Sequence, residues 1–303
     1  MANASNSWWL SAFLTDDENN QYLALSHILV MNSYTVYRSS LFDIHSLVYN
    51  QYSNHTTDST VLDNSQGGEF NVSIGGTFFF GSTAPGNATK QLRAATTTEA
   101  VQFDLVFDLS APILWNMGIG GLFQFGSAQT GEWSMPAGRT TGTVVRNGTA
   151  IPVNPARSLT WFDRQWNVGN SPGSLNWTWF ELHLTSASSK HEKVSLWVYD
   201  SESVGHRQWA TIHTAGNANI VEPVASFESF GDTWTSPATN ITYAQHWDLS
   251  LSDGTQLTIS SIYPDQEIVE GSAYEGFVVI KGTDGSGGCI SGYGLVEMTN
   301  SGL

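Results

Sequence analysis

Short runs of alternating residues, rich in β-branched and aromatic side chains, recur along the whole chain. Clusters of Gly, Asn, Asp and Ser separate them, with turn sequences such as Ser252-Asp253-Gly254 and Asn147-Gly148. This pattern is typical of antiparallel β-structure, in which tight turns join neighbouring strands. The clearest predicted strands are residues 21–30, 101–109, 140–146, 193–199, 256–262 and 276–281.

Helical periodicity is scarce. No stretch longer than about ten residues holds apolar groups at helical spacing between matching caps, so we expect helices only as short connectors. Many strands with few covering helices favour closed barrels, which remove exposed sheet edges and can enclose a ligand cavity. The polar stretch 146–158 carries two prolines and predicts a boundary near residue 155. We therefore expect an N-terminal β domain over 1–155 and a C-terminal one over 156–303.

The charge balance restricts the partners. Twenty-seven acids against eleven Lys and Arg give a formal net charge of -16, which argues against nucleic acid and against acidic membrane surfaces. Charged residues make up 13% of the chain and aromatic residues 12%, a balance that suits an extensively packed β-protein. We expect a neutral, hydrophobic small molecule as substrate. The oligomeric state stays open.

Covalent and metal-dependent chemistry is disfavoured. Cys289 is the single cysteine, which excludes an intramolecular disulfide and any multi-cysteine zinc site, and no neighbouring histidine would activate its thiol. No Gly-x-Ser-x-Gly elbow is present. We predict no metal site, because the following histidines lack metal-ligand spacing: His27, His45, His206, His213 and His246. We also predict no cofactor.

No apolar run approaches the roughly twenty residues of a membrane span, so we expect no stable membrane insertion. The first residues lack the basic and apolar regions of a signal peptide. Asn-x-Ser/Thr glycosylation acceptors favour a secreted, glycosylated protein whose signal peptide has been removed. Chance alone would supply roughly four such acceptors in a chain of this composition. A cytoplasmic location therefore stays open. These acceptors are Asn3, Asn54, Asn71, Asn87, Asn147, Asn176 and Asn240.

One heptapeptide, residues 161–167, places an acid, a permanent cation and an amide among three aromatic rings. Aromatic surroundings disfavour the charged form of a carboxyl group, whereas an adjacent guanidinium favours it. Asp163 is therefore a candidate for proton transfer, with Arg164 beside it. A purely structural Asp163–Arg164 ion pair is the alternative interpretation.

Three further places could serve a pocket. Trp8 and Trp9 begin an alternating strand, so one ring points inward, and Trp9 could line either a core or a ligand site. Glu181 and His183 share one face of a strand, which could line a pocket or a wet surface. Glu275 follows an aromatic residue at the start of a strand and is a better pocket candidate than the acids of the turn at 264–267.

The sequence Trp161-Phe162-Asp163-Arg164-Gln165-Trp166 resembles the aromatic-x-Asp-His/Arg-Gln-Trp signature of the carotenoid hydratase (hydroxyneurosporene synthase) and kievitone hydratase family. Other segments resemble the family in the same order and span nearly the whole chain. They are Trp8-Trp9, Pro264-Asp265-Gln266-Glu267, Tyr274-Glu275-Gly276 and Gly292-Tyr293-Gly294-Leu295-Val296-Glu297-Met298-Thr299.

The resemblance implies two lipocalin-like β-barrel domains with an apolar cavity, and chemistry on hydrophobic isoprenoids or polyketides. Fungal relatives include Diels-Alderases and hetero-Diels-Alderases, so membership alone does not determine the reaction. Three departures weaken the transfer of a carotenoid substrate. Arg164 stands where carotenoid hydratases usually carry His, Asn167 replaces the usual Gly, and Tyr274 replaces the usual Trp.

The expected reaction is acid-base loss or addition of water, because an alkene or a leaving hydroxyl needs an acid beside it. Asp163 is the candidate acid, Arg164 could hold a carbonyl or phenolate, and Glu275 could be the second acid-base group. The expected substrate-binding residues are Trp161, Gln165, Trp166, Trp9, Glu181 and His183. A dehydrated intermediate could then close by [4+2] cycloaddition through orientation alone. A Diels-Alderase working only by shape and a non-catalytic carrier barrel are the alternatives.

Overall fold

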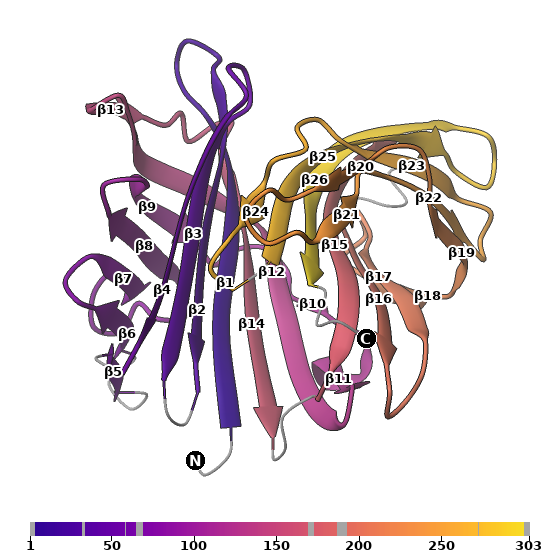
Figure 1. Ribbon diagram of the computed structural model, residues 1–303, viewed down its shortest axis with the longest axis horizontal. Coiled ribbons are helices and arrows are strands. Elements are labelled where there is room, and N and C mark those ends of the chain that lie inside the picture. The colour runs from indigo at the N-terminus through magenta and orange to yellow at the C-terminus, as the bar shows by residue number, and fades with distance from the viewer. Residues whose placement is uncertain are drawn as a thin grey trace. The chain divides into compact units, whose positions relative to one another are not determined.

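The computed structural model describes residues 4–31, 34–57, 59–64, 69–168, 173–186, 193–271 and 273–299. Almost all of this is antiparallel β-structure (Figure 1), and the one helical segment among these residues is a short 3₁₀ turn, η2 (Ile119–Gly121). The prediction of an all-β fold is confirmed. The chain forms two compact units. Unit 1 contains Met1–Ile113 and Ser134–Trp166, and unit 2 contains Leu114–Trp133 and Asn167–Leu303.

Unit 1 is built on a long, nearly closed sheet with the strand order β4-β3-β2-β1-β14-β12-β9-β8-β7-β6-β5. Its strands are β1 (Ala4–Thr15), β2 (Gln21–Val30), β3 (Thr35–Asp43), β4 (Val48–Thr56), β5 (Ser59–Asn64), β6 (Glu69–Ile74), β7 (Phe78–Ser82), β8 (Gln91–Thr97), β9 (Gln102–Asp108), β13 (Thr149–Pro152) and β14 (Leu159–Val168). The long strand β12 (Ala128–Arg146) and the end of β14 carry residues of both units.

The sheet of unit 1 curls so that distant strands meet through their side chains. Phe78 on β7 packs against Tyr52 on β4, with ring centroids 5.5 Å apart, although the two strands are far apart in the sheet order. Phe80 continues this core and contacts Phe162 on β14 at 5.5 Å. Burial of these rings removes apolar surface from water, which is the main force that holds such a sheet closed.

Unit 2 contains a second nearly closed sheet with the order β18-β17-β16-β15-β26-β25-β23-β22-β19. Its strands are β15 (Leu175–Ser186), β16 (Lys193–Ser201), β17 (Arg207–His213), β18 (Asn219–Glu222), β19 (Val224–Ser229), β22 (His246–Leu251), β23 (Gln256–Ser261), β24 (Glu267–Ile268), β25 (Ala273–Thr283) and β26 (Cys289–Thr299). The short strands β20 (Thr233–Thr235) and β21 (Thr242–Ala244) pair with each other, while β10 (Leu114–Trp115) and β11 (Leu122–Phe125) pair with β12.

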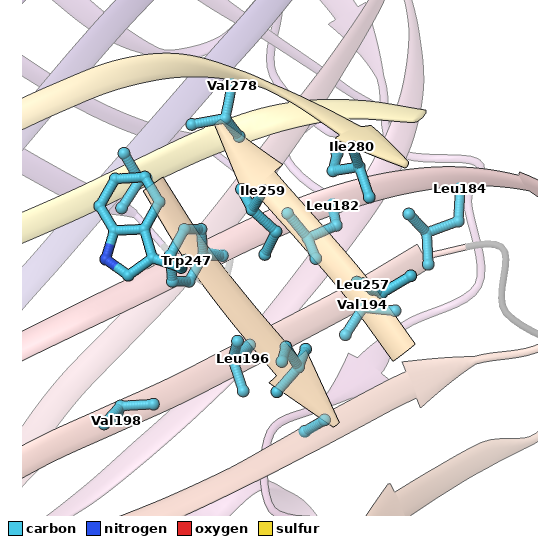
Figure 2. Close-up of a cluster of buried hydrophobic side chains, with 14 of the residues drawn as sticks. Leu182, Leu184, Val194, Leu196, Val198, Trp247, Leu257, Ile259, Val278 and Ile280 are labelled. Carbon is cyan, nitrogen blue, oxygen red and sulfur yellow. The ribbon is translucent and has the colours of Figure 1, made fainter. Parts of the chain in front are cut away.

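The core of unit 2 is almost purely apolar, and Figure 2 shows its aliphatic side chains converging from several strands. Phe180 on β15 meets Trp247 on β22 edge-on, with ring centroids 5.2 Å apart. Leu182 and Leu196 are fully buried in the same cluster. Phe180 and Leu182 lie two residues apart and therefore share a face of β15, so the intervening Glu181 faces the other way.

The predicted strands correspond to real ones. Residues 21–30 are β2, 193–199 lie within β16, and 256–262 correspond to β23. The turn Asn147-Gly148 joins the paired residues Arg146 and Thr149, with φ of 50° and 75°. Positive φ at both positions suits Asn-Gly and matches the twist of a two-residue hairpin.

The stretch at 146–158 contains β13, which pairs with β12 inside unit 1. The boundary near residue 155 between an N-terminal and a C-terminal β domain stays a prediction. No helix among the described residues has the length and apolar character needed to cross a membrane. Asn3, the first predicted glycosylation acceptor, lies outside the described residues.

Candidate functional site

Strand β14 sends its signature residues to two different faces of the sheet in unit 1. The guanidinium of Arg164 lies over the Trp8 ring at 4.5 Å and near the Trp166 ring at 5.5 Å. Phe162 packs into the aromatic core, so Phe162, Arg164 and Trp166 share the core-side face. Alternation along the strand therefore places Asp163 on the opposite face.

The acid of the signature occupies a buried, aromatic environment. Asp163 is 6% exposed, and the indole Nε1 of the fully buried Trp161 donates a hydrogen bond to its Oδ1 at 2.8 Å. Trp9 lies on the same face, because Trp8 takes the core side of β1 with Arg164. Gln165 also shares this face and is half-buried. The structure thus brings together Trp9, Trp161, Asp163 and Gln165.

Arg164 has a separate environment. Its guanidinium donates to the backbone carbonyl of Ser7 at 3.3 Å, to the Asn6 side-chain oxygen at 2.5 Å and to the carbonyl of Gln165. These bonds and the two indole rings hold the cation in place on the core side. Arg164 and Asp163 are therefore adjacent in sequence but lie on opposite faces of the sheet, in different surroundings. The predicted contact of Arg164 with a substrate carbonyl or phenolate stays a prediction.

The face of the unit 1 sheet that carries Trp9 also carries a chain of hydrogen-bonded polar side chains, which the sequence did not reveal. His27 on β2 lies opposite Trp9 on β1 and opposite Arg38 on β3. Its Nε2 lies 2.9 Å from the Ser7 hydroxyl, and its Nδ1 lies 2.6 Å from Arg38 Nη2. Burial, and secondly the guanidinium of Arg38, hold the pKa of His27 well below its usual value of 6.5. The only available signal was a histidine inside a strongly apolar strand.

In unit 2, Glu181 and His183 lie on the face of β15 that is opposite to the apolar core, and both are buried. The ring of His183 stacks on Tyr293 of β26, with centroids 5.1 Å apart. Burial, and secondly the positive charge of Lys193, lower the pKa of His183 well below 6.5. Burial, and secondly the negative charge of Glu181, raise the pKa of the Tyr293 phenol. These two predicted residues therefore lie in a buried polar environment.

Glu275 on β25 also faces this buried side of unit 2 and lies directly opposite Glu297 on β26. Glu275 is fully buried, and Glu297 is 8% exposed. Side chains at directly opposite positions of paired strands lie close together on one face of the sheet, so the pairing brings two carboxyl groups to the same place. The sequence indicates Glu297 only as part of the closing motif, because its position opposite Glu275 depends on strand pairing.

Two sequence motifs prove to have structural explanations. Glu267 accepts hydrogen bonds from Ser236, from Thr239 at 2.7 Å and from the Tyr243 hydroxyl at 2.8 Å, so it ties the β20–β21 hairpin to β24. In the Gly-Tyr-Gly motif, a Cβ on Gly294 would lie 2.0 Å from the carbonyl oxygen of Glu181. Glycine is required there because the backbones of β15 and β26 approach closely.

Within the described ranges, no group of three or more His, Cys, Asp or Glu side chains is arranged to hold a metal ion. The expectation of a metal-free, cofactor-free protein stays a prediction. The described polar clusters instead consist of carboxyl, imidazole, guanidinium and hydroxyl groups between aromatic rings, which suits proton transfer.

The profile of AttH-like proteins matches residues 41–301. The chain belongs to the AttH-like family. Kievitone hydratase from Fusarium solani subsp. phaseoli is 37% identical over 99% of this chain and 84% of its own length. Dehydratase asqC from Emericella nidulans is 28% identical over 98% of the chain and 85% of its own length.

The crystal structure of kievitone hydratase from Nectria haematococca matches with a TM-score of 0.87 and 32% identity, covering 97% of this chain and 89% of that one. The lipocalin-like architecture and the family resemblance read from the sequence are confirmed. This AttH-like protein is a hydratase-like enzyme, and the curated relatives are named as a hydratase and a dehydratase.

Proposed function

We propose that this AttH-like enzyme adds water to, or removes water from, a hydrophobic terpenoid or polyketide, with Asp163 as the general acid. The observation that carries the proposal is the buried Asp163 carboxyl held by the Trp161 indole on the face shared with Trp9. The hydratase and dehydratase names of the relatives support the reaction class.

The geometry suits an acid that protonates an alkene or a leaving hydroxyl. The hydrogen bond from Trp161 to one carboxyl oxygen orients the group, which reduces the entropy lost in reaching a reactive arrangement. The indole rings on the same face would stabilise a developing carbocation through their π faces. A positioned general acid contributes about 10²- to 10⁴-fold to the rate.

The remaining roles complete the proposal. Glu275 is the proposed second acid-base group. Arg164, on the core-side face away from Asp163, stays a predicted ligand of a carbonyl or phenolate. Gln165, Glu181 and His183 are proposed substrate contacts, and Trp166, which shares the core-side face with Arg164, stays a predicted one. Where loss of water leaves a reactive diene, the same aromatic surroundings would promote [4+2] closure by orientation, an effect of several kcal/mol.

The deciding experiment follows turnover of a panel of terpenoid and polyketide alcohols and alkenes by mass spectrometry, with wild type beside Asp163→Asn. The substitution keeps an oxygen that can accept the Trp161 N–H, so it removes the acid while preserving the local geometry. We expect a loss of at least about a hundredfold in kcat with little change in substrate affinity. Asp232→Asn, which removes an exposed carboxylate of unit 2, is the matched control and should retain full activity.

Other outcomes would point to the alternatives. Combined-mass adducts formed equally by wild type and Asp163→Asn would indicate a cycloaddition enzyme in which Asp163 is structural. In that case Trp166→Ala should reduce the rate more than Asp163→Asn, since shape would determine it. Ligand binding without turnover in any protein of the series would indicate a carrier.

A further inference from the structure

We infer that Ser7, His27 and Arg38 form a relay of hydrogen-bond donors that presents the Ser7 hydroxyl to an oxygen atom of the substrate. The chemical class it would take is a carbonyl, phenolate or enolate oxygen. The inference deepens the proposed function and rests on it in one respect, namely that the oxygen belongs to the substrate of the enzyme.

The three residues lie on three consecutive strands of the sheet in unit 1. Register places His27 directly opposite Arg38, and Ser7 lies on the same face of β1 as Trp9, the cross-strand partner of His27. The distances are 2.9 Å from Ser7 Oγ to His27 Nε2 and 2.6 Å from His27 Nδ1 to Arg38 Nη2. All three side chains are buried, with exposures of 7%, 8% and 9% in chain order.

The direction of the hydrogen bonds follows from the chemistry of the guanidinium. Arginine has only donors, so His27 Nδ1 must accept and carries no proton. Its ring is neutral, because burial and the adjacent cation both disfavour a second positive charge. The single ring proton therefore lies on Nε2 and is donated to Ser7 Oγ.

This arrangement leaves the Ser7 hydroxyl as an outward donor. Its oxygen accepts from His27, so its own proton is available to another acceptor, and among the described residues His27 is the one hydrogen-bond partner of Ser7 Oγ. A nucleophilic serine needs the opposite polarity, with an imidazole that accepts its proton and a carboxylate behind it. Here a cation stands behind the imidazole, so the chain stabilises negative charge on a bound oxygen.

The relay and the proposed acid share one face of the sheet. Arg164 lies over Trp8 on the core side, which places Ser7 on β1 and Asp163 on β14 together on the opposite face. Elimination or addition of water next to a carbonyl uses a donor for an anionic oxygen and a proton source, together with a base that takes up the remaining proton. Ser7 would touch the substrate, whereas His27 and Arg38 act as positioning residues.

The first test is nitrogen NMR of the full chain labelled at histidine, with His27→Gln to assign the signal. We expect His27 to be neutral at pH 7 with its proton on Nε2, and to stay neutral as the pH falls through the ordinary histidine range near about 6.5. A cationic ring at pH 7, or a proton on Nδ1, would overturn the relay. A purely structural chain with the same hydrogen bonds would share this tautomer, so the role toward a substrate oxygen is decided by the binding test that follows.

The second test is the binding of 4-nitrophenol, followed by its absorbance, to wild type, Ser7→Ala and Ser11→Ala. We expect wild type to bind the phenolate form, Ser7→Ala to bind it about tenfold to a hundredfold more weakly, and Ser11→Ala, on the same face of β1, to match wild type. Equal binding by Ser7→Ala, or no binding by wild type, would refute the assignment. Neither test requires turnover, so failure here is distinguishable from failure of Asp163 as the acid.

Discussion

Replacing Gly294 by alanine should destabilise unit 2, because β26 approaches β15 too closely there for a side chain. The new Cβ would lie 2.0 Å from the carbonyl oxygen of Glu181 and 3.1 Å from the Cα of Leu182, whereas ordinary contacts begin at 3.4 Å. The obstructing atoms are backbone, and β26 is paired with β15 on one side and β25 on the other. The strand therefore cannot move away without breaking hydrogen bonds.

Overpacking of this kind costs typically 1–3 kcal/mol, and we expect about 3 kcal/mol because the obstructing atoms are backbone. The measurement is urea unfolding followed by tryptophan fluorescence. With a slope of about 2–3 kcal/mol/M, the midpoint of the transition of unit 2 should fall by about 1 M.

Gly216→Ala is the matched control, since its Cβ would meet nothing closer than Thr214 Oγ1 at 3.8 Å. It should change the free energy of unfolding by less than about 0.5 kcal/mol. If Gly294→Ala proved as stable as Gly216→Ala, the close approach of β15 and β26 would not be the reason for the glycine, and the explanation of the Gly-Tyr-Gly motif would be wrong.

Three further predictions concern titration and buried hydrogen bonds. His27 and His183 have pKa values lowered by burial, so below about pH 6.5 the unfolded chain binds protons that the folded chain does not. Stability should therefore fall from pH 7 to pH 5, by up to about 1.4 kcal/mol per pH unit for each histidine, and urea midpoints that stay constant over this range would contradict the prediction. Tyr243→Phe removes the 2.8 Å hydrogen bond to Glu267 and should cost about 1–3 kcal/mol in urea unfolding, while an unchanged midpoint would show that the bond is dispensable. Burial raises the pKa of Tyr274 to about 12, so the ultraviolet titration of Tyr274→Phe should match that of wild type up to about pH 11 and differ only above it.

Much of the fold could be predicted because its signals are local. Alternation along residues 21–30 predicted β2, and the Asn-Gly pair at 147–148 predicted a hairpin turn that the structure contains. The same alternation predicted that Glu181 and His183 share a face of one strand, where the structure places them. Short-range patterns suffice here because a strand and a tight turn are determined by the residues within them.

The candidate site could be predicted only in part. Asp163 and Trp161 lie two residues apart, so the sequence predicts that both belong to the site. In the structure a hydrogen bond joins them. Adjacency in sequence predicts the same chemistry for Arg164, yet the strand sends its side chain to the other face. Register in the folded sheet, which no single strand encodes, brings His27 to Ser7 and to Arg38.

The sequence by itself determined the all-β class, the strands and turns, the family resemblance and the alternation of side chains along each strand. Tertiary structure alone decided the order of strands in each sheet and the register between them, and so placed Glu275 opposite Glu297 and His27 opposite Arg38. The physical reason is that side-chain alternation is a local property of an extended backbone, whereas pairing between strands is a non-local balance of core burial and hydrogen bonding.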